Sequence, residues 1–224
     1  MKSKIRNVIP FLSLFFILPA FAQNVDAGIS IGPEGLKSFY FSISDYYHVP
    51  EKEVVVVRER KIPDEELPVV FFIAARAGVE PKVIVDLRLG GSSWYNISIK
   101  YGIYADVYYV PLVVDPGPPY GKAYGYYKKK PKKEWKKIKL ADADIINLVN
   151  LRYISEYYDY KPENIVKMRS DGKNYVVISE NVKVEKKGNK DKSKGKNKGN
   201  NKKNNWFFIN LFPQEDSKIN FEKI

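Results

Sequence analysis

The chain of 224 residues contains no cysteine and a single histidine, His48. Without cysteine it has no disulfide, no thiol nucleophile and no thiolate metal ligand. A lone histidine cannot build a metal site from several imidazoles. A hydrolase with paired carboxylates stays open, and Asp45, Glu51 and Glu156 are its candidate acids. We therefore predict no catalytic, cofactor-binding or metal-binding residue and expect no cofactor.

The first 22 residues have the pattern of a secretory signal peptide. Three basic residues precede an apolar run that ends in Ala20-Phe21-Ala22. A basic start, an apolar centre and small residues at the cleavage site define such a signal. The run is shorter than the about 20 residues that a transmembrane helix needs. The pattern predicts export to the periplasm or secretion, with no transmembrane span after cleavage.

Positive charge is concentrated in two blocks rather than spread along the chain. The formal net charge is +12, range 121–140 contains nine lysines and one acid, and range 183–204 contains ten lysines and two acids. Outside these blocks and residues 1–22, 16 basic and 23 acidic residues remain. We therefore expect a mildly acidic body with two cationic segments. This charge distribution bears on which partners the protein binds and does not indicate its fold.

Segments 43–58, 73–88 and 154–169 align with one another without a gap. Each has a proline near its middle and an arginine at its end, and apolar residues recur at helical spacing. The matching apolar positions are Ile43, Ile73 and Ile154; Val49, Val79 and Tyr160; Val54, Ile84 and Ile165; and Val57, Leu87 and Met168. A helix, a turn with proline and a second helix form the unit that this pattern predicts.

Such units bury their apolar faces only by packing on one another. We predict an all-α fold of repeated helix-turn-helix hairpins, with two hairpins in 33–103 and a third in 141–182. Tyr175–Ile178 fits a short helix or a strand.

The ranges that do not follow the repeat differ in composition. Range 104–140 is rich in tyrosine, proline, glycine and lysine. Proline and glycine at this density disfavour helices and interior strands, so we expect an irregular basic insert. Range 183–205 is a lysine, asparagine and glycine tract with too few apolar residues to fold, which predicts a disordered tail. An aromatic segment, 206–224, follows it.

Arg58, Arg88 and Arg169 close the three aligned segments and are candidates for a row that binds anions. A guanidinium group presents a rigid fork that suits carboxylate or phosphate. The alternative is that these arginines complement helix carboxyl termini and pair with neighbouring acids, such as Glu59 or Asp86.

The insert interleaves aromatic rings with lysines, which attract polyanions, while rings stack on bases or sugar faces. The alternative is a solvated loop whose lysines keep the protein soluble. The candidate binding residues are Tyr120, Tyr124, Tyr126, Tyr127, Lys128 and Trp135 of the insert, Trp94 before it, and Trp206, Phe207 and Phe208 of the aromatic segment.

The run Gly117-Pro118-Pro119-Tyr120-Gly121-Lys122-Ala123-Tyr124-Gly125-Tyr126-Tyr127-Lys128, with Ser93-Trp94 upstream, resembles exported bacterial proteins of unknown function. The resemblance covers about residues 33–182 and implies no activity and no site residues. Range 88–103 also resembles the short turn of DNA-binding helix-turn-helix proteins. An exported protein does not meet the genome, so we expect no genomic DNA partner.

Together these observations predict an exported, non-catalytic binding or adaptor protein of the cell envelope. Its basic segments would contact an anionic polymer or lipid surface, and Trp206–Phe212 would dock on a protein partner or on the body of the chain. Two alternatives stay open. One is a cell-wall or carbohydrate-acting hydrolase, with two acids converging in a cleft beside Trp94 or Tyr95, and the other is a structural subunit of an envelope assembly.

Overall fold

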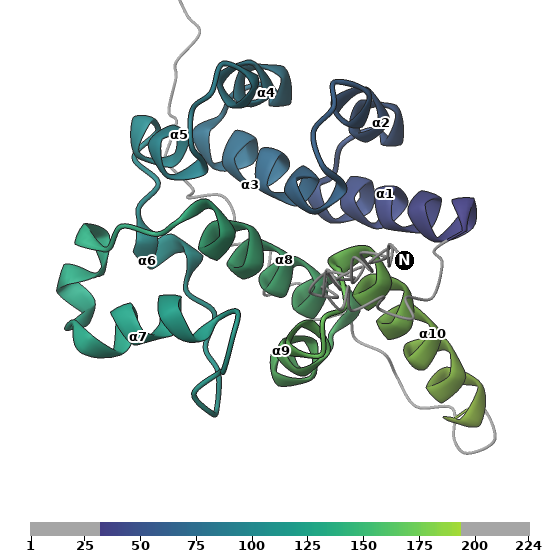
Figure 1. Ribbon diagram of the computed structural model, residues 1–224. Coiled ribbons are helices and arrows are strands. Elements are labelled where there is room, and N and C mark those ends of the chain that lie inside the picture. The colour runs from purple at the N-terminus through teal and green to yellow at the C-terminus, as the bar shows by residue number, and fades with distance from the viewer. Residues whose placement is uncertain (1–31, 194–224) are drawn as a thin grey trace, which may run out of the picture.

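The computed structural model describes residues 32–193, and every regular element in this range is a helix (Figure 1). The predicted all-α class is therefore confirmed, and no strand occurs between residues 32 and 193. No helix in this range is long and apolar enough to cross a membrane. The predicted signal peptide, the tail beyond residue 193 and the aromatic segment lie outside the described residues.

Three helical hairpins correspond to the three aligned segments, as the repeat predicted. In each hairpin a longer helix is followed, after a short turn, by a helix of nine residues. The first helices are neighbours, because α3 packs against both α1 and α8 (Figure 1). The hairpins are α1 (Pro33–Tyr47) with α2 (Glu51–Glu59), α3 (Leu67–Ala77) with α4 (Pro81–Leu89), and α8 (Asp142–Tyr158) with α9 (Pro162–Ser170).

The three hairpins turn in the same way. Each first helix ends at a residue with left-handed backbone geometry, His48 at φ 55°, Gly78 at φ 65° and Asp159 at φ 48°. The residue after it donates its backbone N–H to a carbonyl in the last turn of the helix, which satisfies an otherwise orphaned acceptor. Identical turns at aligned positions show that the sequence repeat is a structural repeat.

The apolar columns of the repeat form the centre of the core. Two of the columns are fully buried in all three copies, at 0% exposure. These columns are Ile43, Ile73 and Ile154, and Val54, Ile84 and Ile165. The β-branched run Val54–Val57 is accordingly helical, because burial against the neighbouring hairpin overrides its strand propensity.

The second and third hairpins are each extended by a further helix. These are α5 (Trp94–Lys100) and α10 (Tyr175–Ser193), so Tyr175–Ile178 is helical. Ser93 caps α5 by accepting a hydrogen bond from the Asn96 N–H at 3.1 Å. The α10 helix continues to Ser193, so the structure corrects the predicted start of the tail at residue 183.

The insert is not the irregular segment that we expected. It contains α6 (Ala105–Tyr108), α7 (Gly121–Lys129) and the 3-10 helix η2 (Lys132–Lys137). Proline is confined to the segments between these helices, and the two glycines of α7 are tolerated because tyrosines on the same helix are buried. Tertiary packing thus outweighs the local composition.

Each second helix is also followed by a residue with positive φ, namely Lys61 at 67°, Gly91 at 87° and Gly172 at 89°. A Cβ at Gly91 would meet nothing within 4 Å, so only backbone strain opposes a side chain there. We expect Gly91→Ala to lower the free energy of unfolding by about 1–2 kcal/mol. Gly125→Ala, in helical geometry and open space within α7, is the matched control and should raise it by about 0.5–1 kcal/mol. Urea unfolding measures both changes, and equal effects of the two substitutions would contradict this account.

Candidate functional site

The three arginines of the repeat bind three consecutive acids of the chain. The acidic triplet, Asp64, Glu65 and Glu66, forms the 3-10 helix η1 directly before α3. The Arg58 Nε lies 2.5 Å from Asp64 Oδ1, the Arg169 Nη1 lies 3.3 Å from Glu65 Oε1, and the Arg88 Nε lies 3.0 Å from Glu66 Oε2. One short segment therefore holds the end of each hairpin.

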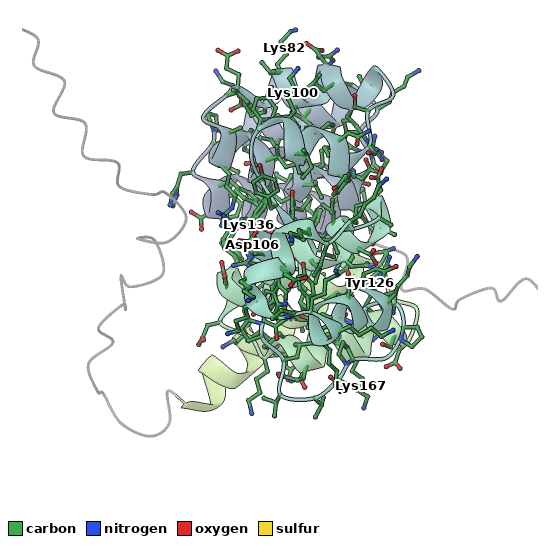
Figure 2. All side chains as sticks on the ribbon, turned by 90° about the vertical axis from the view of Figure 1, so that its left-hand side faces the viewer. Lys82, Lys100, Asp106, Tyr126, Lys136 and Lys167 are labelled. Atoms are coloured by element: carbon green, nitrogen blue, oxygen red, sulfur yellow. The ribbon has the colours of Figure 1, made fainter. Side chains whose placement is uncertain are left out.

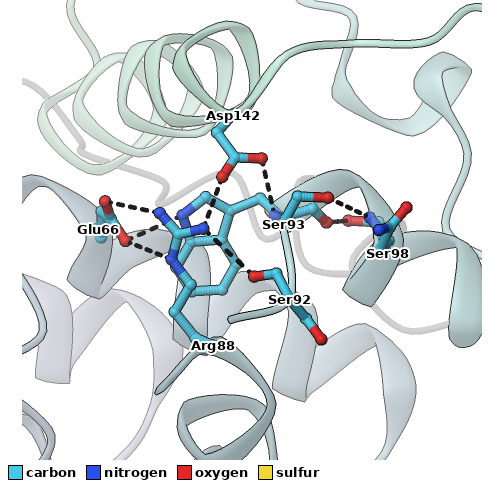
Figure 3. Close-up of polar contacts among 8 residues, drawn as sticks. Glu66, Arg88, Ser92, Ser93, Ser98 and Asp142 are labelled. Carbon is cyan, nitrogen blue, oxygen red and sulfur yellow. Dashed lines mark hydrogen bonds and ion pairs between the residues drawn. The ribbon is translucent and has the colours of Figure 1, made fainter. Parts of the chain in front are cut away.

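Arg88 makes the densest set of these contacts (Figure 3). Its Nε and Nη2 donate to the two carboxylate oxygens of Glu66 at 3.0 and 3.1 Å, and its Nη1 donates to Asp142 at 2.6 Å. The guanidinium group lies over the Trp94 ring, 4.7 Å from the ring centroid. Burial alone would lower the pKa of Arg88, but the hydrogen bonds with Glu66 and Asp142 raise it above its usual value. Arg88 therefore stays charged, and the carboxylates of Glu66 and Asp142 balance its charge.

Arg169 repeats this arrangement in the third hairpin. Its guanidinium group lies 4.6 Å from the Tyr175 ring centroid, and its Nη1 donates to the Lys173 carbonyl at 3.1 Å. Glu65 accepts the Tyr175 backbone N–H at 2.8 Å, just as Asp142 accepts that of Trp94 at 2.8 Å. In both copies an arginine lies on the first aromatic ring of the following helix, and a carboxylate caps that helix.

These contacts favour the alternative that the arginines have internal partners. The acids are not the ones expected from sequence proximity, because Asp86 pairs with Arg60 and Lys82 instead. Glu59 takes part in no ion pair within residues 32–193. A free row of three anion-binding arginines is therefore not present in this fold.

Two acids lie beside Trp94, but they are not the candidate acids Asp45, Glu51 and Glu156 of the hydrolase alternative. Glu66 and Asp142 do converge beside Trp94, but their oxygens are held by Arg88, the Trp94 indole N–H and the Trp94 backbone N–H. The Trp94 ring is completely buried. Of the surface hollows in residues 32–193, the two of about 330 and 310 Å³ are not lined by Trp94 or Tyr95.

Two of the three candidate acids accept hydrogen bonds from tyrosines. Asp45 accepts a hydrogen bond from the Tyr157 hydroxyl at 3.1 Å, and Glu156 accepts one from the Tyr46 hydroxyl. Glu51 lines the hollow of about 330 Å³ with Glu34 and Lys37. No group of three or more His, Cys, Asp or Glu side chains in residues 32–193 could hold a metal ion.

A cluster of aromatic rings gives residues 104–140, here called the basic end, a core of their own. Tyr109 lies at the centre, 4.5 Å from the Trp135 ring, 5.0 Å from Tyr127 and 5.7 Å from Tyr124, measured between ring centroids. The Trp135 indole N–H donates to the Tyr127 carbonyl at 3.1 Å, which ties η2 to α7. The basic end is a folded element, and its helices α6 and α7 lie together at the lower left of Figure 1.

Most of the tyrosines predicted to bind a ligand belong to this core. Tyr120, Tyr124 and Tyr127 are 1%, 8% and 3% exposed, so their rings cannot stack on an external base or sugar. Tyr120 instead shares a hydrogen bond of 2.7 Å with the Tyr175 hydroxyl of α10. Tyr126 is half-buried and lies on the face shown in Figure 2. Trp206, Phe207 and Phe208 lie outside the described residues.

The lysines of the basic end are on its outside. Each of them is exposed, and one, Lys128, pairs with an acid, the equally exposed Asp115. The lysines are Lys122, Lys128, Lys129, Lys130, Lys132, Lys133, Lys136, Lys137 and Lys139. Figure 2 looks onto this end of the molecule, with Lys136 at mid-height, Lys100 above it and Lys167 below.

Three of these lysines lie on aromatic rings. Lys132 Nζ is 5.8 Å from the Trp135 ring centroid, Lys136 Nζ is 5.8 Å from that of Tyr104, and Lys139 Nζ is 5.7 Å from that of Tyr95. These rings position the charges without neutralising them. In the sequence, the one signal for the aromatic core beneath the lysines is that aromatic residues alternate with lysines in this range.

Comparison with known proteins adds no family to this geometry: no protein-family model, no curated protein and no solved structure matches the chain.

Proposed function

We propose that the protein is exported and binds an anionic surface of the cell envelope through its basic end, without catalysing a reaction. The observation that carries this proposal is the arrangement of nine exposed lysines around a buried aromatic core. Residues 104–140 contain nine lysines and three acids, Asp106, Asp115 and Glu134, so the basic end has a formal net charge of +6.

A folded cationic element suits this role better than a flexible loop. Each lysine held near an anionic membrane contributes about 1 kcal/mol of attraction. Because α7 and η2 already order the backbone of these lysines, binding does not have to order it. The repeat hairpins serve in this proposal as the scaffold that presents the basic end.

The signal-peptide pattern at residues 1–22 supports a location in the periplasm or outside the cell. The segment Trp206–Phe212 completes the proposal as a second contact, with a protein partner or with the body of the chain. An anionic lipid surface and an anionic wall polymer share the chemistry that the lysines recognise.

Replacing four exposed lysines of the basic end tests the proposal. We expect Lys129→Gln, Lys130→Gln, Lys133→Gln and Lys137→Gln together to weaken binding to vesicles with about one third phosphatidylglycerol by tenfold or more, because several surface attractions are lost at once. Co-sedimentation between about 0.05 and 0.5 M salt measures this, since attraction between exposed charges is screened over this range. The same series with immobilised anionic wall polymer distinguishes the two surfaces.

The matched control removes the same charge elsewhere on the body. Lys37, Lys52, Lys61 and Lys161 are exposed and form no ion pair within residues 32–193. Their replacement by glutamine should change binding by less than about threefold. Equal losses in the two quadruple variants would show that overall charge, and not the basic end, controls binding.

A further inference from the structure

Arg76, in the last turn of α3, has no carboxylate partner within residues 32–193. Its side chain is half-buried, and its guanidinium carbon lies 4.7 Å from the centroid of the Phe72 ring. Its Nε is buried and has no hydrogen-bond partner. Charged groups that leave water are almost always paired, because an unpaired one costs free energy.

A second arginine lies close by on α8. Arg152 donates from Nη2 to the carbonyls of Val107 and Tyr109 at 3.1 and 2.8 Å, and its Nε is likewise buried without a partner. Burial lowers the pKa of Arg76, and the charge of Arg152 lowers it further. The two guanidinium groups therefore lie within electrostatic reach of each other.

The local charge is not balanced. Glu156 is the carboxylate at this place, 3.5 Å from Arg152, and it also accepts the hydroxyl hydrogen of Tyr46. The hydroxyl of Tyr47, which both arginines also influence, is buried without a hydrogen-bond partner. Among the described residues, two arginines and the unused Tyr47 hydroxyl thus lie where α1 and α3 end against α8, and Glu156 is the one carboxylate that forms an ion pair with either arginine.

The repeat indicates what is missing. In the alignment Arg76 occupies the column of Tyr46 and Tyr157, and the residue before it, Ala75, occupies the column of Asp45 and Glu156. The first and third copies exchange reciprocal hydrogen bonds, from Tyr46 to Glu156 and from Tyr157 to Asp45. The second copy keeps a donor at this position but has no acid to receive it.

We propose that Arg76 binds a carboxylate group supplied from outside residues 32–193, at the junction of α1, α3 and α8. The donor column of the repeat binds carboxylates in both other copies, and a guanidinium fork suits that group best. Arg152 adds attraction, and the Tyr47 hydroxyl provides a further donor. This site adjoins the basic end, since Arg152 donates to the carbonyls of Val107 and Tyr109, but it involves none of the exposed lysines and goes beyond the surface contact proposed for them.

Thermal unfolding of the full chain in sodium acetate and in sodium chloride, at equal pH and ionic strength, tests the site. We expect acetate to raise Tm by about 3 °C relative to chloride at concentrations well above Kd, since a ligand of the native state stabilises it. Arg76→Gln should lose this difference, and Arg76→Lys should keep part of it. Arg60→Gln, which removes an arginine that already has a carboxylate partner, is the control and should behave like the wild type.

The side-chain Nε–Hε resonance of Arg76 gives a second readout that does not depend on stability. It should move in a saturable way with acetate and not with chloride. A titration with an acetylated Glu-Glu peptide distinguishes the source of the carboxylate. If the peptide shifts the resonance with a midpoint concentration at least tenfold lower than that of acetate, the ligand is an acidic chain. If the two midpoint concentrations are equal, the ligand is a small molecule. An acetate effect of equal size in wild type and Arg76→Gln overturns the proposal, as does a stronger Arg76-dependent response to inorganic phosphate than to acetate.

Discussion

Between about pH 10 and pH 11 the protein is expected to unfold in a single cooperative transition as its buried tyrosines ionise. Burial is the first cause that raises the pKa of these hydroxyls, and neighbouring charges are secondary. Eight tyrosines of the core have less than a tenth of their surface exposed and a raised pKa. They are Tyr46, Tyr47, Tyr108, Tyr120, Tyr124, Tyr127, Tyr153 and Tyr175.

The direction follows from linkage. A tyrosine whose pKa is higher in the folded than in the unfolded chain contributes stability that is complete below the unfolded pKa of about 10. That contribution is lost as the pH rises towards the folded pKa. At pH 11 each such group favours the unfolded chain by about 1.4 kcal/mol, so eight cost about 11 kcal/mol of the about 5–15 kcal/mol that typically stabilises a domain.

Circular dichroism of the helices and the absorbance of tyrosinate, recorded on the same samples, measure this transition. The two signals should change together. Tyr47→Phe is an informative variant, because the Tyr47 hydroxyl has no hydrogen-bond partner to lose. It should leave stability at pH 7 nearly unchanged and move the alkaline midpoint upwards. Ionisation of all the tyrosines near pH 10 with intact helices would contradict the raised pKa values of the buried ones.

The repeat was predictable because its evidence is distributed over whole columns of the alignment. A buried isoleucine begins each aligned segment and a buried β-branched residue lies in each second helix, so no single position had to be interpreted alone. The turns followed from the same alignment, since prolines and glycines occur near matching places. His48, Lys61 and Asp159 show that the backbone keeps these turns even where the residue is not glycine.

The insert was not predictable in this way because its order depends on distant contacts. Tyr124 donates to the Val110 carbonyl at 2.5 Å, Tyr127 to the Ala105 carbonyl at 2.6 Å, and Tyr120 reaches α10. These partners lie between 14 and 55 residues away in the chain. Local composition therefore pointed to a loop, whereas the tyrosines form a core.

The acidic triplet was missed for a related reason. Partners for the three arginines were sought close to each arginine, yet Arg169 finds Glu65 across more than a hundred residues. The sequence offered one signal for this pairing. Three consecutive acids precede α3, and the number of arginines that end the hairpins is also three. The unpartnered Arg76 became visible only when the structure showed what Tyr46 and Tyr157 do in the equivalent positions.

Arg88→Leu is expected to destabilise the protein by about 3 kcal/mol, which corresponds to a fall in Tm of roughly 6–12 °C. The substitution leaves Glu66 and Asp142 near each other without their shared cation, and their side chains are only 13% and 31% exposed. It also removes the guanidinium group from the Trp94 ring. Calorimetry or thermal unfolding followed by circular dichroism measures the change.

Arg60→Leu provides the matched control, because Arg60 pairs with Asp86 at a more exposed position and its loss should cost less than about 1 kcal/mol. Adding Glu66→Gln to Arg88→Leu removes one of the uncompensated carboxylates, so the double variant should recover part of the lost stability. Recovery would assign the penalty to unpaired charge, and it would mean that the acidic triplet joins the hairpins through its arginines. If Arg88→Leu were as stable as the wild type, the hairpins would be held by their apolar columns alone, and the triplet would only select the register in which they pack.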